Sequence, residues 1–269
     1  MADEYPFLKG HGTHNDFVLL PDHDGSMHGD LGPDRVRALC DRRGGIGGDG
    51  VLRVVRATPG SDSAWFMDYR NADGSISEMC GNGIRVFARY LLEEGLADPT
   101  QSLPIDTRDG VKTVTFDGDQ ITVDMGTPRL LGETTVSVGE RSWSAVHVDI
   151  GNPHAVAFVD DLDEAGTLLT SPAFDNAVYP HGANVEFVVR RGARHVAMRV
   201  HERGSGETQA CGTGACAVMV AASAADGPQR DVDYRVDLPG GTLTIRWAAD
   251  DRVLMTGPAL IVARGMTSL

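Results

Sequence analysis

Two short cysteine-containing segments stand out in this chain of 269 residues. Cys80-Gly81-Asn82-Gly83 and Cys211-Gly212-Thr213-Gly214 share the pattern Cys-Gly-x-Gly, and each precedes an apolar run that is typical of a helix. A thiol at a helix N-terminus lies at the positive end of the helix dipole, which lowers its pKa towards neutrality. The glycine N–H groups beside it can bind a carboxylate. The two segments therefore predict a carboxylate site that is served by two acidic thiols.

Two thiols suit one reaction in particular, the inversion of an amino-acid α-carbon. Inversion removes a proton from one face of the carbon and delivers a proton to the other face. One cysteine, Cys80 or Cys211, can act as the thiolate base while the other supplies a proton as the thiol. Charge that develops on the substrate carboxylate is stabilised by N–H groups at the helix N-termini. This chemistry needs neither a metal nor an organic cofactor, and we expect none.

The two cysteine segments belong to an internal repeat. Cys80 and Cys211 are 131 positions apart, and the same offset relates Gly110–Phe116 to Gly241–Trp247. A repeat of this length indicates two related domains. We place one domain at residues 1–125, with Cys80, and the other at residues 126–257, with Cys211. Residues 258–269 are expected to return to the first domain.

The same offset also shows where the two halves differ. Asn71 corresponds to Glu202, so the repeat keeps the thiols and changes a polar residue that precedes them. This difference suits a substrate whose two ends must be distinguished. Cys40 and Cys216 lie outside the repeated motif, and we expect both to be buried structural residues.

Short β-rich segments outnumber helices and are separated by Gly, Asp and Pro turn signals. The predicted helices are Pro33–Asp41, Gly83–Glu94 and Gly214–Ala225, and the last is apolar nearly all round, as expected of a helix buried within its domain. The order predicts an α+β fold rather than a strict alternation of strands and helices. The predicted strands are Val51–Val55, Trp65–Tyr69, Val111–Phe116, Gln120–Met125, Ala145–Val148, Ala155–Val159, Val185–Val189, Val196–Val200, Thr242–Trp247 and Arg252–Met255.

Composition narrows the class of protein. Hydrophobic residues make up 41% and charged residues 23%, which is ordinary for a globular chain, and the net charge of −14 disfavours binding to nucleic acid or to anionic membranes. The first residues lack the apolar core of a signal peptide, and the longest apolar stretch, Ala215–Ala225, is too short to span a membrane. We therefore expect a cytoplasmic protein with reduced thiols.

Several segments, in order along essentially the whole chain, resemble the diaminopimelate epimerase family. Asn71–Ser75 leading to Met79–Gly83 is similar to the first family signature, and Glu202–Thr208 leading to Ala210–Gly214 is similar to the second. The further matching segments are Asn15-Asp16-Phe17, Asp41-Arg42-Arg43, Gly151-Asn152-Pro153-His154 and Asn184-Val185-Glu186. The resemblance implies an isomerase without a cofactor that interconverts LL- and meso-2,6-diaminopimelate in lysine and peptidoglycan synthesis.

The resemblance also implies a fold and a set of site residues. It implies two pseudo-symmetric domains, each a strand-rich barrel around a central helix, with the active site in the cleft between them, and a homodimer. Cys80 and Cys211 match the acid/base pair, and His154 and Glu202 match residues that tune the thiols. Some members have Gln where this chain has Gly50, so a side-chain contact is absent there. The matched substrate-binding residues are Asn15, Asn71, Gly81, Asn82, Asn152, Asn184, Glu202, Arg203, Gly212 and Thr213.

Other functions remain open from the residues alone. A proline or hydroxyproline racemase also uses two cysteines, although it lacks the Asn71–Gly74 signature and the Glu202-Arg203 pair. A redox or amino-acid-binding protein could use the two cysteines as a disulfide switch, although no Cys-x-x-Cys motif supports it. The asparagines could simply form turns, Glu202-Arg203 could be a solvated pair, and His154 could be structural. Four early histidines have spacing that resembles a metal site, but we expect no zinc there: His11, His14, His23 and His28.

Overall fold

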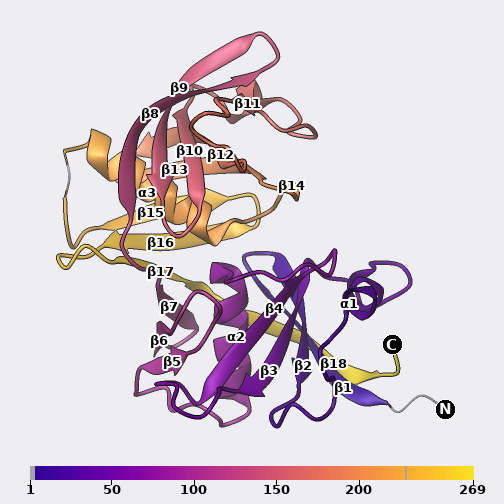
Figure 1. Cartoon of the computed structure of the whole chain (residues 1–269). Coiled ribbons are helices and arrows are strands. Elements are labelled where there is room, and N and C mark those ends of the chain that lie inside the picture. The colour runs from indigo at the N-terminus through magenta and orange to yellow at the C-terminus, as the bar shows by residue number, and fades with distance from the viewer. Residues whose placement is uncertain (1–3, 228) are drawn as a thin grey trace. The chain divides into compact units, whose positions relative to one another are not determined.

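The computed structural model describes residues 4–227 and 229–269. The chain divides into two compact units (Figure 1). Unit 1 contains the residues up to Val123 together with Gly257–Leu269, and unit 2 contains Asp124–Thr256. Each unit combines a sheet with a long buried helix, which confirms the α+β class.

Unit 1 is built on a five-stranded sheet in the order β18-β1-β2-β3-β4. β2 and β3 are parallel and the other neighbours are antiparallel. β5, β6 and β7, which pair antiparallel with one another, complete the unit. The strands of unit 1 are β1 (Tyr5–Gly12), β2 (Asn15–Pro21), β3 (Gly50–Arg56), β4 (Trp65–Asn71), β5 (Leu103–Ile105), β6 (Lys112–Asp117), β7 (Gln120–Asp124) and β18 (Leu260–Thr267).

Helices pack on both faces of this sheet. α1 (Pro33–Cys40) places Val36 and Leu39 against Val18 and Leu20 of β2. α2 (Gly81–Glu93) contacts all five strands of the sheet and is buried along most of its length. Successive β2 side chains therefore face different helices, which explains why the middle of this strand is apolar without alternation.

Unit 2 is a longer sheet in the order β11-β8-β9-β10-β12-β13-β15-β16-β17, with β14 paired to β13. The β10–β12 and β13–β15 pairs are parallel. A 3₁₀ helix, Leu162–Ala165, follows β10. The strands of unit 2 are β8 (Arg129–Val138), β9 (Arg141–Asp149), β10 (Pro153–Phe158), β11 (Ala173–Phe174), β12 (Asn184–Gly192), β13 (His195–Glu202), β14 (Gly206–Glu207), β15 (Asp233–Leu238), β16 (Gly241–Trp247) and β17 (Val253–Pro258).

The helix α3 (Gly212–Ala225) is the centre of unit 2. It contacts β9, β10, β12, β13, β15 and β16, so the sheet curves around it (Figure 1). Its residues from Gly214 to Ser223 are buried on every side, as its uniformly apolar sequence predicts. The barrel that the resemblance implied is present only as this curvature, because no closed ring of strands is assigned in residues 4–227 and 229–269.

The two later helices begin earlier than their sequences predicted. α2 begins at Gly81 rather than Gly83, and α3 begins at Gly212 rather than Gly214. The cause is the preceding cysteine, which acts as the N-cap and draws the glycine-rich segment into the first helical turn. Glycine has a low helix propensity, so the sequence pattern favoured a later start.

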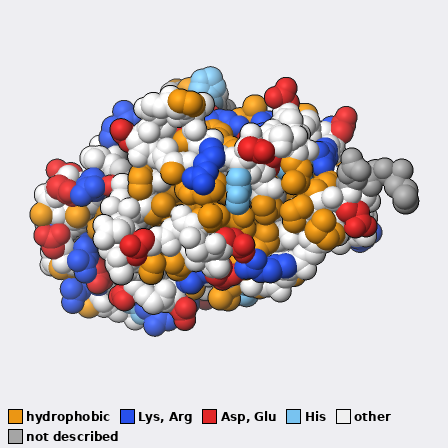
Figure 2. Space-filling view, turned by 90° about the horizontal axis from the view of Figure 1, so that it is seen from below, with side chains coloured by type: hydrophobic (Ala, Val, Ile, Leu, Met, Phe, Trp, Pro, Cys, Tyr) orange, Lys and Arg blue, Asp and Glu red, His pale blue; other side chains and the backbone are white. Residues whose placement is uncertain are grey.

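The surface of unit 1 includes apolar side chains on its edge strand. Leu260, Val262 and Met266 of β18 are exposed. Figure 2 shows one face of the molecule on which hydrophobic side chains gather between charged ones. Within the described part of the chain, no helix combines the length and apolar character needed to cross a membrane.

Candidate active site

Cys80 and Cys211 occupy the same position in their two units, the N-cap of a buried helix. Both have extended backbone angles, with φ −141° at Cys80 and φ −118° at Cys211. The Cys80 sulfur accepts a hydrogen bond from the Gly83 N–H at 3.4 Å. The Cys211 sulfur accepts one from the Gly214 N–H at 3.3 Å. Each sulfur therefore takes the place of the side-chain oxygen that usually caps a helix.

In unit 1, two predicted asparagines gather around Cys80. The Cys80 thiol lies 3.7 Å from Asn15 Oδ1, which also accepts a hydrogen bond from Asn82 Nδ2 at 3.2 Å. Asn15 in turn donates to Asp49 at 2.7 Å. Asn71 ends β4 and donates to Ser75 Oγ at 3.0 Å, within the turn that follows that strand. The structure thus joins Cys80, Asn15 and Asn82 in one cluster.

Arg85 of α2 hydrogen-bonds to this cluster through Asn82, and the sequence analysis did not predict it. Its side chain is fully buried. It donates to Asn82 Oδ1 at 2.5 Å and to the Pro258 carbonyl at 3.0 Å. A charged residue inside the buried stretch of α2 was the signal that could have revealed it, because buried arginines are rare without partners.

In unit 2, a chain of polar contacts leads to the Cys211 sulfur. Thr213 Oγ1 lies 3.5 Å from Cys211 Sγ and accepts from Asn152 Nδ2 at 3.4 Å. Asn152 Oδ1 lies 3.0 Å from His154 Nε2. The other ring nitrogen of His154, Nδ1, lies 2.7 Å from Glu186 Oε1. All five residues of this series of contacts belong to segments that the sequence singled out, but the sequence analysis assigned no role to Glu186.

Glu202, Arg203 and Asn184 form a second group in unit 2. Asn184 Oδ1 accepts from the Arg203 backbone N–H at 2.9 Å. The Arg203 guanidinium donates to the His181 carbonyl at 3.2 Å. The Glu202 carboxylate accepts from the Thr208 hydroxyl. Glu202 and Arg203 therefore have different partners: Glu202 bonds to Thr208 and also to the thiol of Cys211, and Arg203 bonds to the His181 carbonyl.

The electrostatics of Cys211 differ from the prediction. Burial raises the pKa of the Cys211 thiol well above its usual value, and the carboxylates of Glu202 and Glu186 raise it further. Hydrogen bonds from Thr213 and Gly214 lower the pKa by less. Burial likewise raises the pKa of Glu202. The expectation of a lowered pKa is wrong for Cys211, because desolvation and two carboxylates outweigh the helix N-terminus.

The first turns of α2 and α3 pack against different side chains. A Cβ placed on Gly83 would lie 3.2 Å from Leu52 Cδ2, whereas a Cβ on Gly214 would lie 2.8 Å from Glu186 Oε1. Gly83 and Gly214 are equivalent in the repeat, being 131 positions apart. An apolar side chain thus lies under one helix N-terminus and a carboxylate under the other.

Gly50 is held by close packing. A Cβ there would lie 2.5 Å from the Arg70 carbonyl oxygen, so a side chain has no room without a backbone shift. The remaining cysteines are buried as expected. Cys40 is the last residue of α1 and is buried in the core, which raises its pKa to about 11, and Cys216 lies inside α3.

The four early histidines lie in separate surroundings. His11 and His14 pack against each other, His23 contacts Trp65 and Tyr90, and His28 packs on Tyr5. In the described ranges, no group of three or more His, Cys, Asp and Glu side chains has an arrangement that could hold a metal ion.

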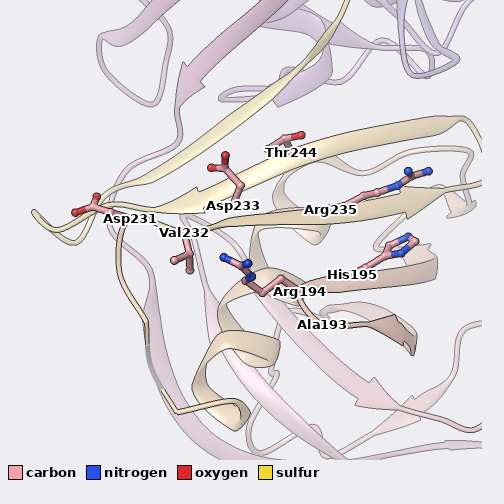
Figure 3. Close-up of a pocket in the computed structure, with 8 residues that line it drawn as sticks. All are labelled: Ala193, Arg194, His195, Asp231, Val232, Asp233, Arg235 and Thr244. Atoms are coloured by element: carbon pink, nitrogen blue, oxygen red, sulfur yellow. The ribbon is translucent and has the colours of Figure 1, made fainter.

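A pocket of about 570 Å³ lies elsewhere in unit 2 and contains none of the predicted site residues. Figure 3 shows its side chains spread along β13, β15 and β16 and the segments just before β13 and β15, rather than converging on one point. His195 lies 2.7 Å from Asp237, which also accepts from Arg235. The lining residues are Ala193, Arg194, His195, Asp231, Val232, Asp233, Arg235 and Thr244. Because His195 and Arg235 already contact Asp237 and the lining residues do not converge, we assign this pocket no role.

The fold recurs in solved structures of low sequence identity. A phenazine biosynthesis protein of the PhzF family from Bacillus anthracis superimposes with a TM-score of 0.74 at 15% identity, covering 98% of this chain and 99% of that one. A hydroxyproline epimerase from Agrobacterium vitis superimposes with a TM-score of 0.68 at 15% identity, covering 98% and 92%. The chain therefore has the two-domain fold of these proteins.

Sequence comparison identifies the particular family. The diaminopimelate epimerase family model matches residues 7–131 and 146–262. A diaminopimelate epimerase from Streptomyces coelicolor is 56% identical over 98% of this chain and 96% of its own length. One from Corynebacterium glutamicum is 45% identical over 97% of both chains. The chain belongs to the diaminopimelate epimerase family, a family of isomerases.

Proposed function

We propose that this protein interconverts LL-2,6-diaminopimelate and meso-2,6-diaminopimelate by proton transfer between its substrate and two cysteines. The observation that carries the proposal is the matched pair of helix N-caps, Cys80 and Cys211, in a chain of this family. The reaction supplies precursors for lysine and peptidoglycan synthesis. It requires no cofactor, since both protons come from side chains.

In the proposed reaction the substrate loses one proton to one cysteine and gains one proton from the other. The thiolate of one cysteine takes the α-proton and becomes a thiol, and the thiol of the other gives a proton to the opposite face and becomes a thiolate. The electron pair left on the α-carbon is delocalised into the substrate carboxylate. N–H groups of Gly81 and Asn82, and of Gly212 and Thr213, are suited to hold that carboxylate because they lie at helix N-termini. His154 and Glu202 tune the Cys211 side of the reaction.

Recognition of the rest of the substrate falls to polar residues near the turns. Arg203 is the candidate for the distal carboxylate, because a guanidinium forms charge-assisted hydrogen bonds with carboxylates. Asn71 and Asn184 are candidates for the same end of the substrate, and Asn15 and Asn152 for the reacting end. Asn15 is supported by its contact with Cys80, and Asn152 by its contact with Thr213.

The decisive experiment is incubation of the enzyme with LL-diaminopimelate in deuterated water. We expect deuterium at the inverted α-carbon and loss of turnover in both Cys80→Ala and Cys211→Ala. Cys40→Ala is the matched control, because Cys40 is a buried thiol at the end of α1, and it should keep most activity. Turnover of proline, or no isotope exchange into any amino acid, would contradict the proposal in favour of a racemase or a binding protein.

We further propose that the protein works as a homodimer in the cytoplasm, as the family resemblance implies. A reducing compartment would keep all four cysteines as the free thiols described here. Light scattering of the purified enzyme measures the mass directly, and a monomer at assay concentration would contradict the dimer.

A further inference from the structure

Glu186 is a fully buried carboxylate to which the proposed reaction gives no role. It forms one end of the polar chain that passes through His154, Asn152 and Thr213 to the sulfur of Cys211. Its oxygen Oε1 contacts His154, and its oxygen Oε2 is buried among the described atoms with no hydrogen-bond partner. A buried carboxylate with one unsatisfied oxygen is costly, so its presence needs an explanation.

The fold itself does not require a carboxylate at this place. In unit 1, Phe17 on β2 pairs with Gly50 on the parallel strand β3. In unit 2, His154 on β10 pairs with Asn184 on the parallel strand β12. These two parallel pairs lie under equivalent helix N-termini.

Two residues further along β3 and β12 lie Leu52 and Glu186, and each is the residue that approaches the equivalent helix glycine. Phe17 and Leu52 of unit 1 therefore correspond to His154 and Glu186 of unit 2. Unit 1 folds with an apolar pair at the place where unit 2 has a buried ionisable pair. Since a buried polar pair is often no more stabilising than a hydrophobic pair of similar volume, stability does not account for the difference.

The geometry points to Glu186 as a positioning residue that acts on Cys211 through His154, and whose negative charge keeps Cys211 a thiol in the resting enzyme. Within the proposed function, on which this inference rests, Cys211 is then the resting acid. The N-terminus of α3 favours a thiolate, and a carboxylate beside Gly214 counteracts that effect.

The other groups around the Cys211 sulfur are few. Glu202 approaches from β13, Glu186 from β12 and His154 from β10, with Tyr179 behind His154. Glu202 and Glu186 both raise the pKa of Cys211, in addition to burial. Neutralising Glu186 alone should therefore shift the titration of Cys211 while Glu202 stays in place.

The test measures alkylation of Cys211 by iodoacetamide as a function of pH, with peptide mass spectrometry to separate Cys211 from the other cysteines. Glu186→Gln keeps the shape of the side chain and an acceptor for His154, and removes the charge. We expect the midpoint of Cys211 alkylation to fall by about one pH unit, and that of Cys80 to stay constant. The control Glu133→Gln removes a charge from the exposed strand β8 and should move neither midpoint.

A second variant covers the case in which Glu186→Gln does not fold. The double variant His154→Phe with Glu186→Leu installs the apolar pair that unit 1 already tolerates. It should keep the melting temperature of the wild type, shift the Cys211 midpoint in the same direction and lower kcat at least tenfold with little change in KM. An unchanged Cys211 midpoint in the folded variants, or wild-type turnover in the double variant, would overturn the inference. Because alkylation needs no substrate, this result is independent of whether diaminopimelate is turned over.

Discussion

Replacing Gly83 or Gly214 by alanine adds the same methyl group at two equivalent positions that have different neighbours. Gly83 and Gly214 both lie in the first turn of a helix, and neither has a positive φ, so alanine is conformationally acceptable at both. In Gly83→Ala the new methyl group would lie 3.2 Å from the end of Leu52, which can move. In Gly214→Ala it would lie 2.8 Å from the buried Glu186 carboxylate and 3.2 Å from the Cys211 sulfur.

The expected magnitudes follow from these distances. Exchange of glycine for alanine in a helix contributes up to about 1 kcal/mol of stability. Overpacking costs about 1–3 kcal/mol where neighbours cannot move. Gly83→Ala should therefore lie within about 0.5 kcal/mol of the wild type. Gly214→Ala should be destabilised by about 1–2 kcal/mol, which lowers the melting temperature by roughly 2–8 °C in a chain of this size.

The measurement is thermal unfolding of both variants by calorimetry, together with kcat for diaminopimelate. Displacement of the Cys211 sulfur should lower kcat of Gly214→Ala about tenfold to a hundredfold, because misplacement of a reacting group by about 1 Å has effects of this size. Gly83→Ala serves as the internal control. Equal stability of the two variants would refute the reasoning, since it would mean that the carboxylate under α3 moves as freely as the leucine under α2.

Three further predictions concern other residues. Arg203→Met should remove a charge-assisted contact of about 1.5–3 kcal/mol and so reduce the preference of kcat/KM for diaminopimelate over lysine, whereas equal losses on both substrates would make Arg203 structural. Arg85→Met removes the donors to Asn82 Oδ1 and the Pro258 carbonyl, and chemical denaturation should show a loss of about 2–5 kcal/mol; a loss below about 1 kcal/mol would contradict this account. Burial, and to a smaller extent the nearby Arg35, lowers the pKa of His28 to about 4 in the folded state. As the pH falls, the unfolded chain therefore takes up this proton at a higher pH than the folded chain. The free energy of unfolding should fall by roughly 3 kcal/mol between pH 6.5 and pH 4. Denaturation series at several pH values should show this slope in the wild type and its absence in His28→Leu.

The cysteine turns could be predicted from sequence because they are local. Cys-Gly-x-Gly before an apolar run defines an N-cap by itself, and the constant offset between Cys80 and Cys211 indicates the duplication without any structure. The helix starts were misplaced by two residues because the pattern could not show that sulfur would accept the hydrogen bond of an N-cap.

Several strands could not be predicted for a different reason. β1 contains Pro6, Gly10 and Gly12, and β18 contains Gly265, so neither resembles a strand on its own. Each is stabilised by its pairing with the other across nearly the whole chain, which is information that local propensity lacks. β15 is an exception, because its alternation of charged and apolar residues was visible in the sequence and was missed.

The pKa of Cys211 could not be predicted because it depends on contacts between distant segments. The helix N-terminus is local and was included in the prediction. Glu186 and Glu202 come from two other strands, and the burial of the thiol comes from the whole of unit 2. A motif therefore identified the reacting atom, but only the folded unit determined its charge state.

The pairing of β1 with β18 has a consequence for synthesis on the ribosome. Unit 2 is encoded within unit 1, so its sheet and α3 are complete before the last strand of unit 1 emerges. β1 must wait for β18, about 250 residues later, which is roughly 12–50 s at usual rates of translation. During that interval the side chain of Val86 in α2, which packs beside Gly10 and Ile261, is partly exposed because Ile261 has not yet been added. The first part of the polypeptide to be made is therefore the last to finish folding, and a released chain that ends before Leu260 should contain a native unit 2 and an incomplete unit 1 that chaperones and proteases can reach.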